Sequence, residues 1–316
     1  MGDGAPVSDP RSVVAVAEVT RSGVVESVHD GVVVALRGID SIAWRAGDPI
    51  LPQYPRSALK PLQAQAMLNA GLVVDQRQLA IACASHSGEA EHLAVVRGLL
   101  ASVGLDESAL DNTPDWPLGA DAARELVRAG GAPERIYQNC SGKHAAMLAT
   151  CVANGWPLDD YLDVDHPLQS WIAAHITAVT GPADHVGIDG CGAPTAYVSL
   201  LGVAQAYQAL ATADHRVARA MRAHPELVGG PGRDVTELMR AVPGLVAKEG
   251  AEGVYVAAMP DGRAVALKIA DGGERARLPV MLAALRSLEI DVSAVTPPPI
   301  LGHGRPVGAV NALVGA

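Results

Sequence analysis

Residues 254–270 read VYVAAMPDGRAVALKIA, and this stretch predicts an antiparallel hairpin. Two apolar runs flank Asp261-Gly262, a dipeptide typical of the tight turn between paired strands. Val-rich runs also fill residues 13–37, where Ser22-Gly23 and Asp30-Gly31 predict further turns in a strand meander. Strands are therefore expected near both ends of the chain.

Most of the remaining chain favours helices. Good helix formers occupy residues 57–71, 89–102, 142–152, 168–180, 195–212, 215–223 and 277–288. Residues 78–84, QLAIACA, form a short apolar run that we expect to be a strand. Strands at both ends with helices between them predict an α/β protein of the α+β type. Its mostly antiparallel sheet should unite the two termini, with helices packed around it.

Composition excludes a disordered protein. Apolar residues make up 49% of the 316 residues and charged residues 18%, which allows a sizeable core. The sequence contains no low-complexity linker and no internal repeat. A single domain over residues 1–316 is therefore expected, with residues 1–11 as a flexible N-terminal segment.

The charge balance and the cysteine content narrow the range of partners. A formal net charge of -10 repels phosphate backbones and anionic membrane faces, so we expect neither nucleic acid nor membrane as a partner. No apolar run is long enough for a membrane span, and the N-terminus lacks the pattern of a signal peptide. Cys83, Cys140, Cys151 and Cys191 are too few for a disulfide framework, which favours a reduced, cytoplasmic protein.

Lysine is rare in this chain. Only Lys60, Lys143, Lys248 and Lys268 are lysines, and arginine supplies all the other basic residues. Arginine stays protonated, whereas a lysine amine can lose its proton and act as a base, nucleophile or ligand. The alternative is that codon bias left these lysines at arbitrary positions. Their neighbourhoods favour function, because three of them lie in polar motifs flanked by Gly or Ser.

The first such motif is Ser57-x-x-Lys60 at the start of an expected helix. Residues three apart on a helix share a face, so an unprotonated Lys60 could activate the Ser57 hydroxyl as a nucleophile. The same pattern occurs in penicillin-interacting serine enzymes. The alternative is a helix-capping serine followed by a solvated lysine.

Two further motifs could line a pocket. Residues 84–89, ASHSGE, contain Ser85 and Ser87 between an expected strand and a helix, where polar loop residues commonly line sites or cap the helix. Lys268 interrupts the apolar run of the C-terminal hairpin. Because an unpaired buried amine is costly, Lys268 either faces solvent or projects into a site.

Cysteines mark the remaining candidates. Cys140 begins the expected helix of residues 142–152, where the helix N-terminus favours the thiolate, and it could act as a nucleophile with His144 or as a metal ligand. Cys191 lies in a Gly-rich loop and could join Cys140 around a soft metal. A plain turn with an incidental cysteine is the alternative for that loop.

Together these motifs resemble a known family. PRSALKPLQ, CASHSGE, NCSGKHAAML, GIDGCGAP, GGPGRD, KEGAEGVY and ALKIADG are similar, in the same order, to blocks of the serine-dependent bacterial L-asparaginases of the rhizobial, thermolabile type. The likeness extends over residues 13–313. It implies a fold similar to serine β-lactamases and serine glutaminases, a homodimer, and hydrolysis of L-asparagine to L-aspartate and ammonia.

The resemblance also implies roles for individual residues. Ser57 would be the nucleophile and Lys60 its base, and Ser85 and Lys268 would form a second Ser–Lys pair. Whether Ser85 or Ser87 fills that position is open.

Ligands are implied in the same way. One Zn²⁺ per chain would lie on Cys140, Lys143 and Cys191. The substrate would be bound by residues of three motifs: Arg56, His86, Asp189 and Gly190. Alternatives are a glutaminase or broader serine amidase, and a non-catalytic zinc or amino-acid sensor.

Overall fold

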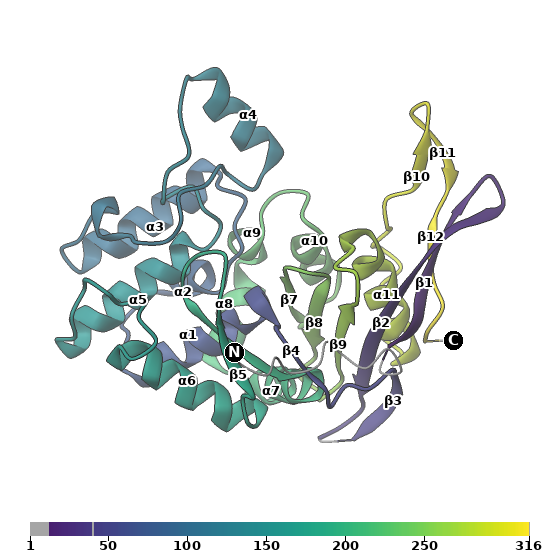
Figure 1. Ribbon diagram of the computed structural model, residues 1–316, viewed down its shortest axis with the longest axis horizontal. Helices are drawn as coiled ribbons and strands as arrows, with labels where there is room; N and C mark the ends of the chain where they lie inside the picture. Colours follow the sequence, from purple (N-terminus) through teal and green to yellow (C-terminus); the bar gives the residue numbers. More distant parts are fainter. Residues whose placement is uncertain (1–12, 40, 316) are drawn as a thin grey trace, which may run out of the picture.

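A seven-stranded antiparallel sheet lies at the centre of the computed structural model, which describes residues 13–39 and 41–315 (Figure 1). Its strands run in the order β12 (Val310–Ala312), β1 (Val14–Arg21), β2 (Val24–Leu36), β9 (Ala264–Ile269), β8 (Val254–Ala258) and β7 (Val246–Gly250), with β3 (Ile42–Ala46) beside β2. Because β1 pairs with β12, the sheet unites both ends of the chain, as predicted. The expected flexible segment, residues 1–11, lies outside the described residues.

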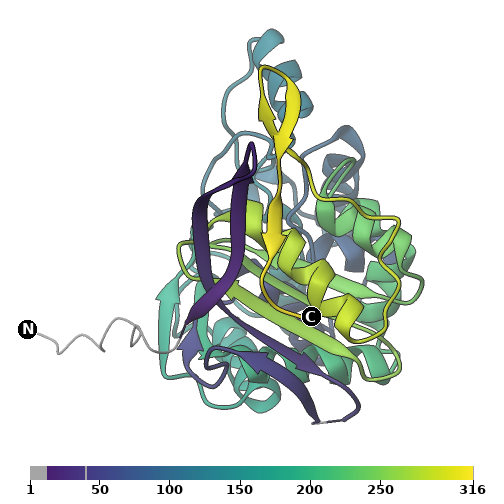
Figure 2. The same ribbon diagram turned by 90° about the vertical axis from the view of Figure 1, so that its right-hand side faces the viewer.

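Helices surround this sheet and confirm the predicted α/β class. Helices α7 (Leu200–Thr212) and α11 (Glu274–Ser287) pack against β9, and Figure 2 shows α11 lying across the sheet. A second group of helices packs together beyond the β7 edge (Figure 1). It comprises α1 (Lys60–Asn69), α2 (Gln76–Ala82), α3 (Ala90–Ser102), α5 (Ser141–Asn154), α6 (Pro167–Thr180) and α8 (Arg216–Ala223). The boundary between the sheet and this group holds the candidate site.

Smaller elements complete the described chain. They are the 3₁₀ helices η2 (Arg56–Leu59) and η3 (Glu107–Ala109), helices α4 (Ala120–Arg128), α9 (Pro225–Val228) and α10 (Asp234–Ala241), and strands β4 (Pro52–Gln53), β5 (His185–Ile188), β6 (Pro194–Ser199), β10 (Ile300–Gly302) and β11 (Arg305–Gly308). Strands β4, β6 and β5 form a small separate sheet. No helix of the described residues is both long and apolar enough to cross a membrane.

One predicted turn is wrong. Ser22 and Gly23 form a hairpin tip with φ of 49° and 84°, but strand β2 continues unbroken through Asp30 and Gly31. A Cβ at Gly31 would lie 2.5 Å from the carbonyl oxygen of Lys268 on the neighbouring strand. The glycine therefore permits close strand approach instead of a turn.

Two other elements also differ from expectation. The apolar run expected as a strand over residues 78–84 belongs mainly to helix α2, whose start is fixed by a capping box of Asp75 and Gln78. Residues 195–199, expected in a helix, lie in strand β6, and the Ser199 side chain caps the following helix α7. Short apolar runs fit helix and strand equally well, so the local caps decided the outcome.

Candidate active site

The Ser57-x-x-Lys60 motif forms a sharp turn against the edge of the sheet. Arg56 precedes Ser57 and has a φ of 53°, a left-handed conformation that is strained for a side chain of this kind. A Cβ at Gly250 on β7 would lie 2.3 Å from the carbonyl oxygen of Pro55. Glycine at this position therefore lets the η2 turn approach the sheet and present Ser57 there.

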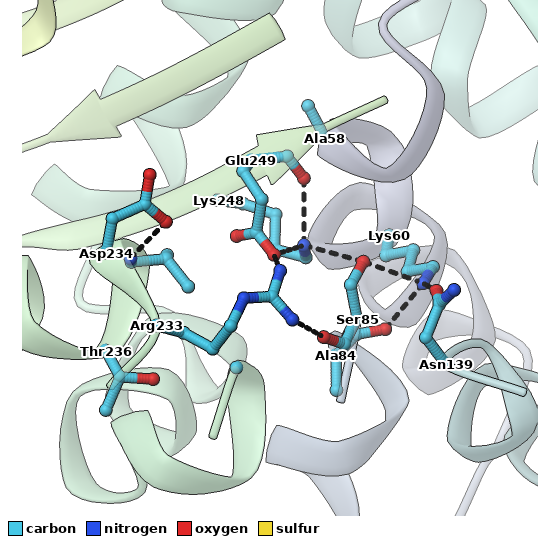
Figure 3. A network of polar contacts seen from close by, with 12 residues as sticks. Ala58, Lys60, Ala84, Ser85, Asn139, Arg233, Asp234, Thr236, Lys248 and Glu249 are labelled. Carbon is cyan, nitrogen blue, oxygen red and sulfur yellow. Dashed lines mark hydrogen bonds and ion pairs between the residues drawn. The ribbon is translucent and has the colours of Figure 1, made fainter. Parts of the chain in front are cut away.

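Ser85 lies between two lysine amines, as Figure 3 shows. Its Oγ is 3.1 Å from Lys60 Nζ and 2.9 Å from Lys248 Nζ. The backbone amide of Ser85 donates to Val228 O, which fixes the extended segment after α2. A hydroxyl can donate one hydrogen bond and accept two, so Ser85 can pass a proton between the two amines.

Lys60 is buried and surrounded by acceptors. Its Nζ donates to Ala84 O at 2.6 Å and lies 3.4 Å from Asn139 Oδ1, in addition to the Ser85 contact. The Lys60 backbone amide donates to the Ser57 carbonyl oxygen, but among the described residues the Ser57 hydroxyl makes no hydrogen bond to the Lys60 amine, so the motif alone does not form the expected pair in this state. Hydrogen bonds of catalytic groups often tighten only when substrate binds.

Lys248 is completely buried at the second end of this network. Its amine donates to the carbonyl oxygen of Glu249 at 2.8 Å and lies 3.1 Å from Glu249 Oε1. Burial lowers the pKa of Lys248 to about 8, against the opposing charge of Glu249 and with the help of the Lys60 charge. This amine can therefore gain or lose a proton near neutral pH.

The expected Ser85–Lys268 pair is wrong, because Lys248 occupies its place. Lys248 faces Val256 and Lys268 faces Val254, and both partners lie on β8, between the two lysine-bearing strands. Adjacent strands are about 4.8 Å apart, so the two lysine-bearing strands are about 10 Å apart, and the two-residue offset between Val254 and Val256 separates the lysine backbones further. Lys268 Nζ instead donates to Ile269 O at 2.5 Å.

Lys248 is the site residue that the motif analysis missed, although a signal was present. Lys248-Glu249-Gly250 places a lysine and a glycine two residues apart on a strand. Penicillin-interacting serine enzymes carry a Lys-Thr-Gly motif in addition to Ser-x-x-Lys. The same Lys-x-Gly spacing in this chain is the local signal that could have directed attention to Lys248.

Ser87 and His86 lie outside the network. Ser87 Oγ donates to Gly229 O at 3.1 Å, so of the two serines Ser85 is the one that contacts the lysine amines. His86 is wholly buried, stacks on His92, and contacts Ser141 Oγ at 2.8 Å through Nε2. Because its ring has no exposed surface, the expected contact of His86 with substrate is not supported.

The other expected substrate-binding residues do lie together. Arg56 Nη2 is 2.7 Å from Asp189 Oδ1, and Arg56 Nε donates to the same oxygen. A Cβ built on Gly190 would lie 3.7 Å from Arg56 Nη2. The loop of residues 189–192 is thus tied to the residue immediately before Ser57.

Comparison with known proteins identifies the family. The model of the L-asparaginase II family matches residues 17–312, nearly the whole chain. The chain belongs to this family. It is accordingly an L-asparaginase, an amidohydrolase, which confirms the family and enzyme class that the motifs predicted.

Comparisons with curated proteins and with solved structures add little to this family assignment. No curated protein matches the chain. Among solved structures, a β-lactamase from Mycobacterium bovis is similar over 77% of this chain and 88% of its own, with 15% sequence identity and a TM-score of 0.33.

A cavity adjoins the Ser57 turn of the asparaginase. Its volume is about 430 Å³, and Arg56 and Lys268 supply cationic groups to its lining. Asp48 and Glu252 supply carboxylates to the same lining, beside several apolar side chains. Neither Ser57 nor Ser85 is among the lining residues, and Arg56 is the lining residue that connects the cavity to the Ser57 turn. A small zwitterion suits this mixture of charges.

The expected zinc ligands converge in the asparaginase. Cys140, Lys143 and Cys191 are all buried, and Lys143 Nζ lies 3.1 Å from Cys191 Sγ. A hydrogen bond with Cys140 lowers the pKa of the Cys191 thiol far below its usual range, against burial and with help from the Lys143 charge. Two thiols and an amine form a donor set that fits zinc.

The mixed donor set is unusual for a metal site. No group of three His, Cys, Asp or Glu residues in the described part of the chain is arranged to hold a metal ion. Burial opposes the charge of Lys143, but the Cys191 and Cys140 sulfurs raise the pKa of its amine above the usual value. Zinc binding would therefore have to displace a proton from Lys143.

Proposed function

We propose that the asparaginase hydrolyses L-asparagine to L-aspartate and ammonia through an acyl-enzyme on Ser57. The observation that carries this proposal is the Ser85 hydroxyl between the amines of Lys60 and Lys248, beside the Ser57 turn. This arrangement offers a base and an acid for the two proton transfers that amide cleavage requires.

The reaction begins when Ser57 attacks the side-chain amide carbon of asparagine and Lys60 accepts the hydroxyl proton. The C–N bond then breaks, and Lys248 supplies a proton to the departing nitrogen through Ser85. Ammonia departs, and the aspartyl group remains bound to Ser57 as an ester. Lys60 returns its proton to Lys248 through Ser85. Water then attacks the ester and gives a proton to Lys60, the C–O bond to Ser57 breaks, and Lys60 passes that proton to the Ser57 oxygen as L-aspartate leaves.

Ser57 suits the role of nucleophile better than Ser85 because substrate can reach it. Ser57 is half-buried, whereas Ser85 retains only 5% of its surface. Ser85 is also held from both sides by lysine amines, which suits a proton relay. The backbone turn at Arg56 further exposes Ser57, in the way that strained turns commonly present catalytic nucleophiles.

We infer that the cavity beside Arg56 receives the amino-acid head group of asparagine. Lys268 has no ion-pair partner among the described residues, and burial lowers the pKa of its amine. A carboxylate from the substrate would stabilise its charge. Asp48 and Glu252 lie in the same cavity and could accept hydrogen bonds from the substrate ammonium.

Asparagine should be hydrolysed faster than glutamine. The extra methylene of glutamine displaces its amide from Ser57 when the head group occupies the same cavity. Discrimination of about 10–200-fold in kcat/KM is expected from one methylene. Ammonia release by the pure protein on both amino acids measures this ratio, and equal specificity constants would show a glutaminase or broader amidase.

The same assay tests whether Lys268 binds the carboxylate of the substrate. Lys268→Met should raise the KM for asparagine by about tenfold with a smaller change in kcat, because one charged contact is lost in ground and transition states alike. Arg305→Met, at an exposed arginine, is the matched control. Absence of any ammonia release by the wild-type protein would favour the amino-acid sensor.

We also propose that Cys140, Lys143 and Cys191 hold one Zn²⁺, which would supply a fixed positive charge near the substrate loop. Cys191→Ser should lower the zinc content measured by elemental analysis from about one ion per chain to almost none, since thiolates are the preferred ligands. Cys83→Ser, at a buried cysteine outside the cluster, should retain the metal. Equal zinc content in both variants would contradict the site.

The assembly state and the cellular location of the protein are also proposals. A homodimer and a cytoplasmic location follow from the resemblance and from the cysteine content. The four cysteines are free in the structure. Sedimentation of the purified protein would measure the assembly state.

A further inference from the structure

Glu249 places a carboxylate against the catalytic lysine network from inside the protein. The residue is 3% exposed, and its Oε1 lies 3.1 Å from Lys248 Nζ and 2.9 Å from Arg233 Nη2 (Figure 3). Its other oxygen, Oε2, is buried and has no hydrogen-bond partner among residues 13–39 and 41–315. A buried carboxylate in this position is costly unless cations compensate its charge.

Arg233 connects Glu249 back to Ser85. One guanidinium nitrogen donates to Glu249 Oε1, and another donates to the carbonyl oxygen of Ser85 at 3.3 Å. Arg233 precedes helix α10, whereas Glu249 lies on β7 and Ser85 follows α2. The carboxylate and the guanidinium thus tie together three elements at the point where Lys248 meets Ser85.

The charges around Lys248 oppose one another. Burial is the largest influence that disfavours a proton on the Lys248 amine, and the charges of Lys60 on α1 and Arg233 before α10 act in the same direction. The thiol of Cys83 and the phenol of Tyr207 lie nearby, and burial raises the pKa of both groups so that they stay neutral. Glu249 supplies the negative charge that favours protonated Lys248.

We propose that Glu249 is a positioning residue of the reaction: its carboxylate holds the Lys248 amine against Ser85 and keeps it protonated until ammonia departs. This inference rests on the proposed function. Without the carboxylate, the amine would lose its proton at lower pH and could not supply it to the leaving nitrogen. Lys248 would then compete with Lys60 as a base instead of acting as the acid.

The test is Glu249→Gln, which keeps the shape of the side chain and a hydrogen-bonding oxygen but removes the charge. The chain has only four lysines, so lysine labelled with ¹³C at Cε gives few NMR signals, and Lys248→Arg identifies the one from position 248. The titration midpoint of Lys248, expected near 8 in the wild type, should fall by about one unit or more in the Gln variant, as expected for a lost opposite charge.

Activity should change in parallel. The alkaline limb of the kcat/KM profile for asparagine should move to lower pH by the same amount, so the loss is several-fold above about pH 8 and small near about pH 6. The substrate ammonium titrates identically with both proteins and cannot produce a difference between them. Glu237→Gln, which removes the same charge from an exposed position, should leave both profiles in place.

Each result has a definite meaning. An unchanged Lys248 midpoint in a folded Glu249→Gln variant overturns the inference, and so does a shifted midpoint that leaves the kcat/KM profile unchanged. Failure of the wild-type protein to release ammonia from asparagine overturns the proposed function instead. The NMR titration does not depend on turnover, so the two failures are distinguishable.

Discussion

Replacing Ser57 with alanine should lower kcat for asparagine by at least ~10³-fold, because the acyl-enzyme can no longer form. The loss should exceed any effect on KM, since the hydroxyl acts in bond formation and contributes little to ground-state binding. Rapid quenching followed by mass spectrometry should detect an aspartyl ester on the wild-type peptide that contains Ser57. That adduct should be missing from the Ser57→Ala variant.

Ser85→Ala and Ser87→Ala are the controls for this experiment. Ser85→Ala should slow turnover by interrupting the relay between Lys60 and Lys248, but the ester should still form on Ser57. Ser87→Ala should stay close to wild type in kcat, because among the described residues the Ser87 hydroxyl bonds only to Gly229 O and contacts neither lysine. An ester found on Ser85, with activity retained by Ser57→Ala, would reverse the roles of the two serines.

Local sequence predicted the sheet well where a turn dipeptide did form a turn. The hairpin of β8 and β9 formed around Asp261-Gly262, and the strands at both chain ends joined in one sheet. Asp30-Gly31 carries the same dipeptide type but lies inside β2, since its glycine is required by the approach of β9. Both a tight turn and a close contact between strands require glycine, so the two cases can be told apart only when the neighbouring strand is known.

The sequence predicted those residues of the candidate site that lie in motifs with recognisable reactive side chains. Ser57, Lys60 and Ser85 lie in one region, and so do Arg56 and Asp189. The Lys-x-Gly spacing marks Lys248 as a candidate, but its pairing with Ser85 was not predictable from local sequence, because Lys248 is 163 residues away and reaches Ser85 only through the register of the sheet. Lys268 has a similar sequence context, but it lies two strands away.

Lys60→Arg should reduce kcat by at least ~10²-fold while the protein remains folded, because general base catalysis is lost. Arginine retains the positive charge, but its guanidinium does not release a proton in proteins. Circular dichroism and thermal unfolding would establish whether the larger side chain fits this buried position. Lys60→Met removes the charge and the base together, and it keeps the test valid if the arginine variant does not fold.

The surroundings of Lys60 explain why an amine is needed at this position. A neutral amine has two N–H groups, which Ala84 O and Asn139 Oδ1 can accept, and one lone pair that remains for a serine hydroxyl. A guanidinium could satisfy both acceptors, but it has no lone pair to offer. If Lys60→Arg is well folded and retains near-normal turnover, the base must be another group. Lys248 would then be the first candidate, because its amine also contacts Ser85 and its pKa is about 8.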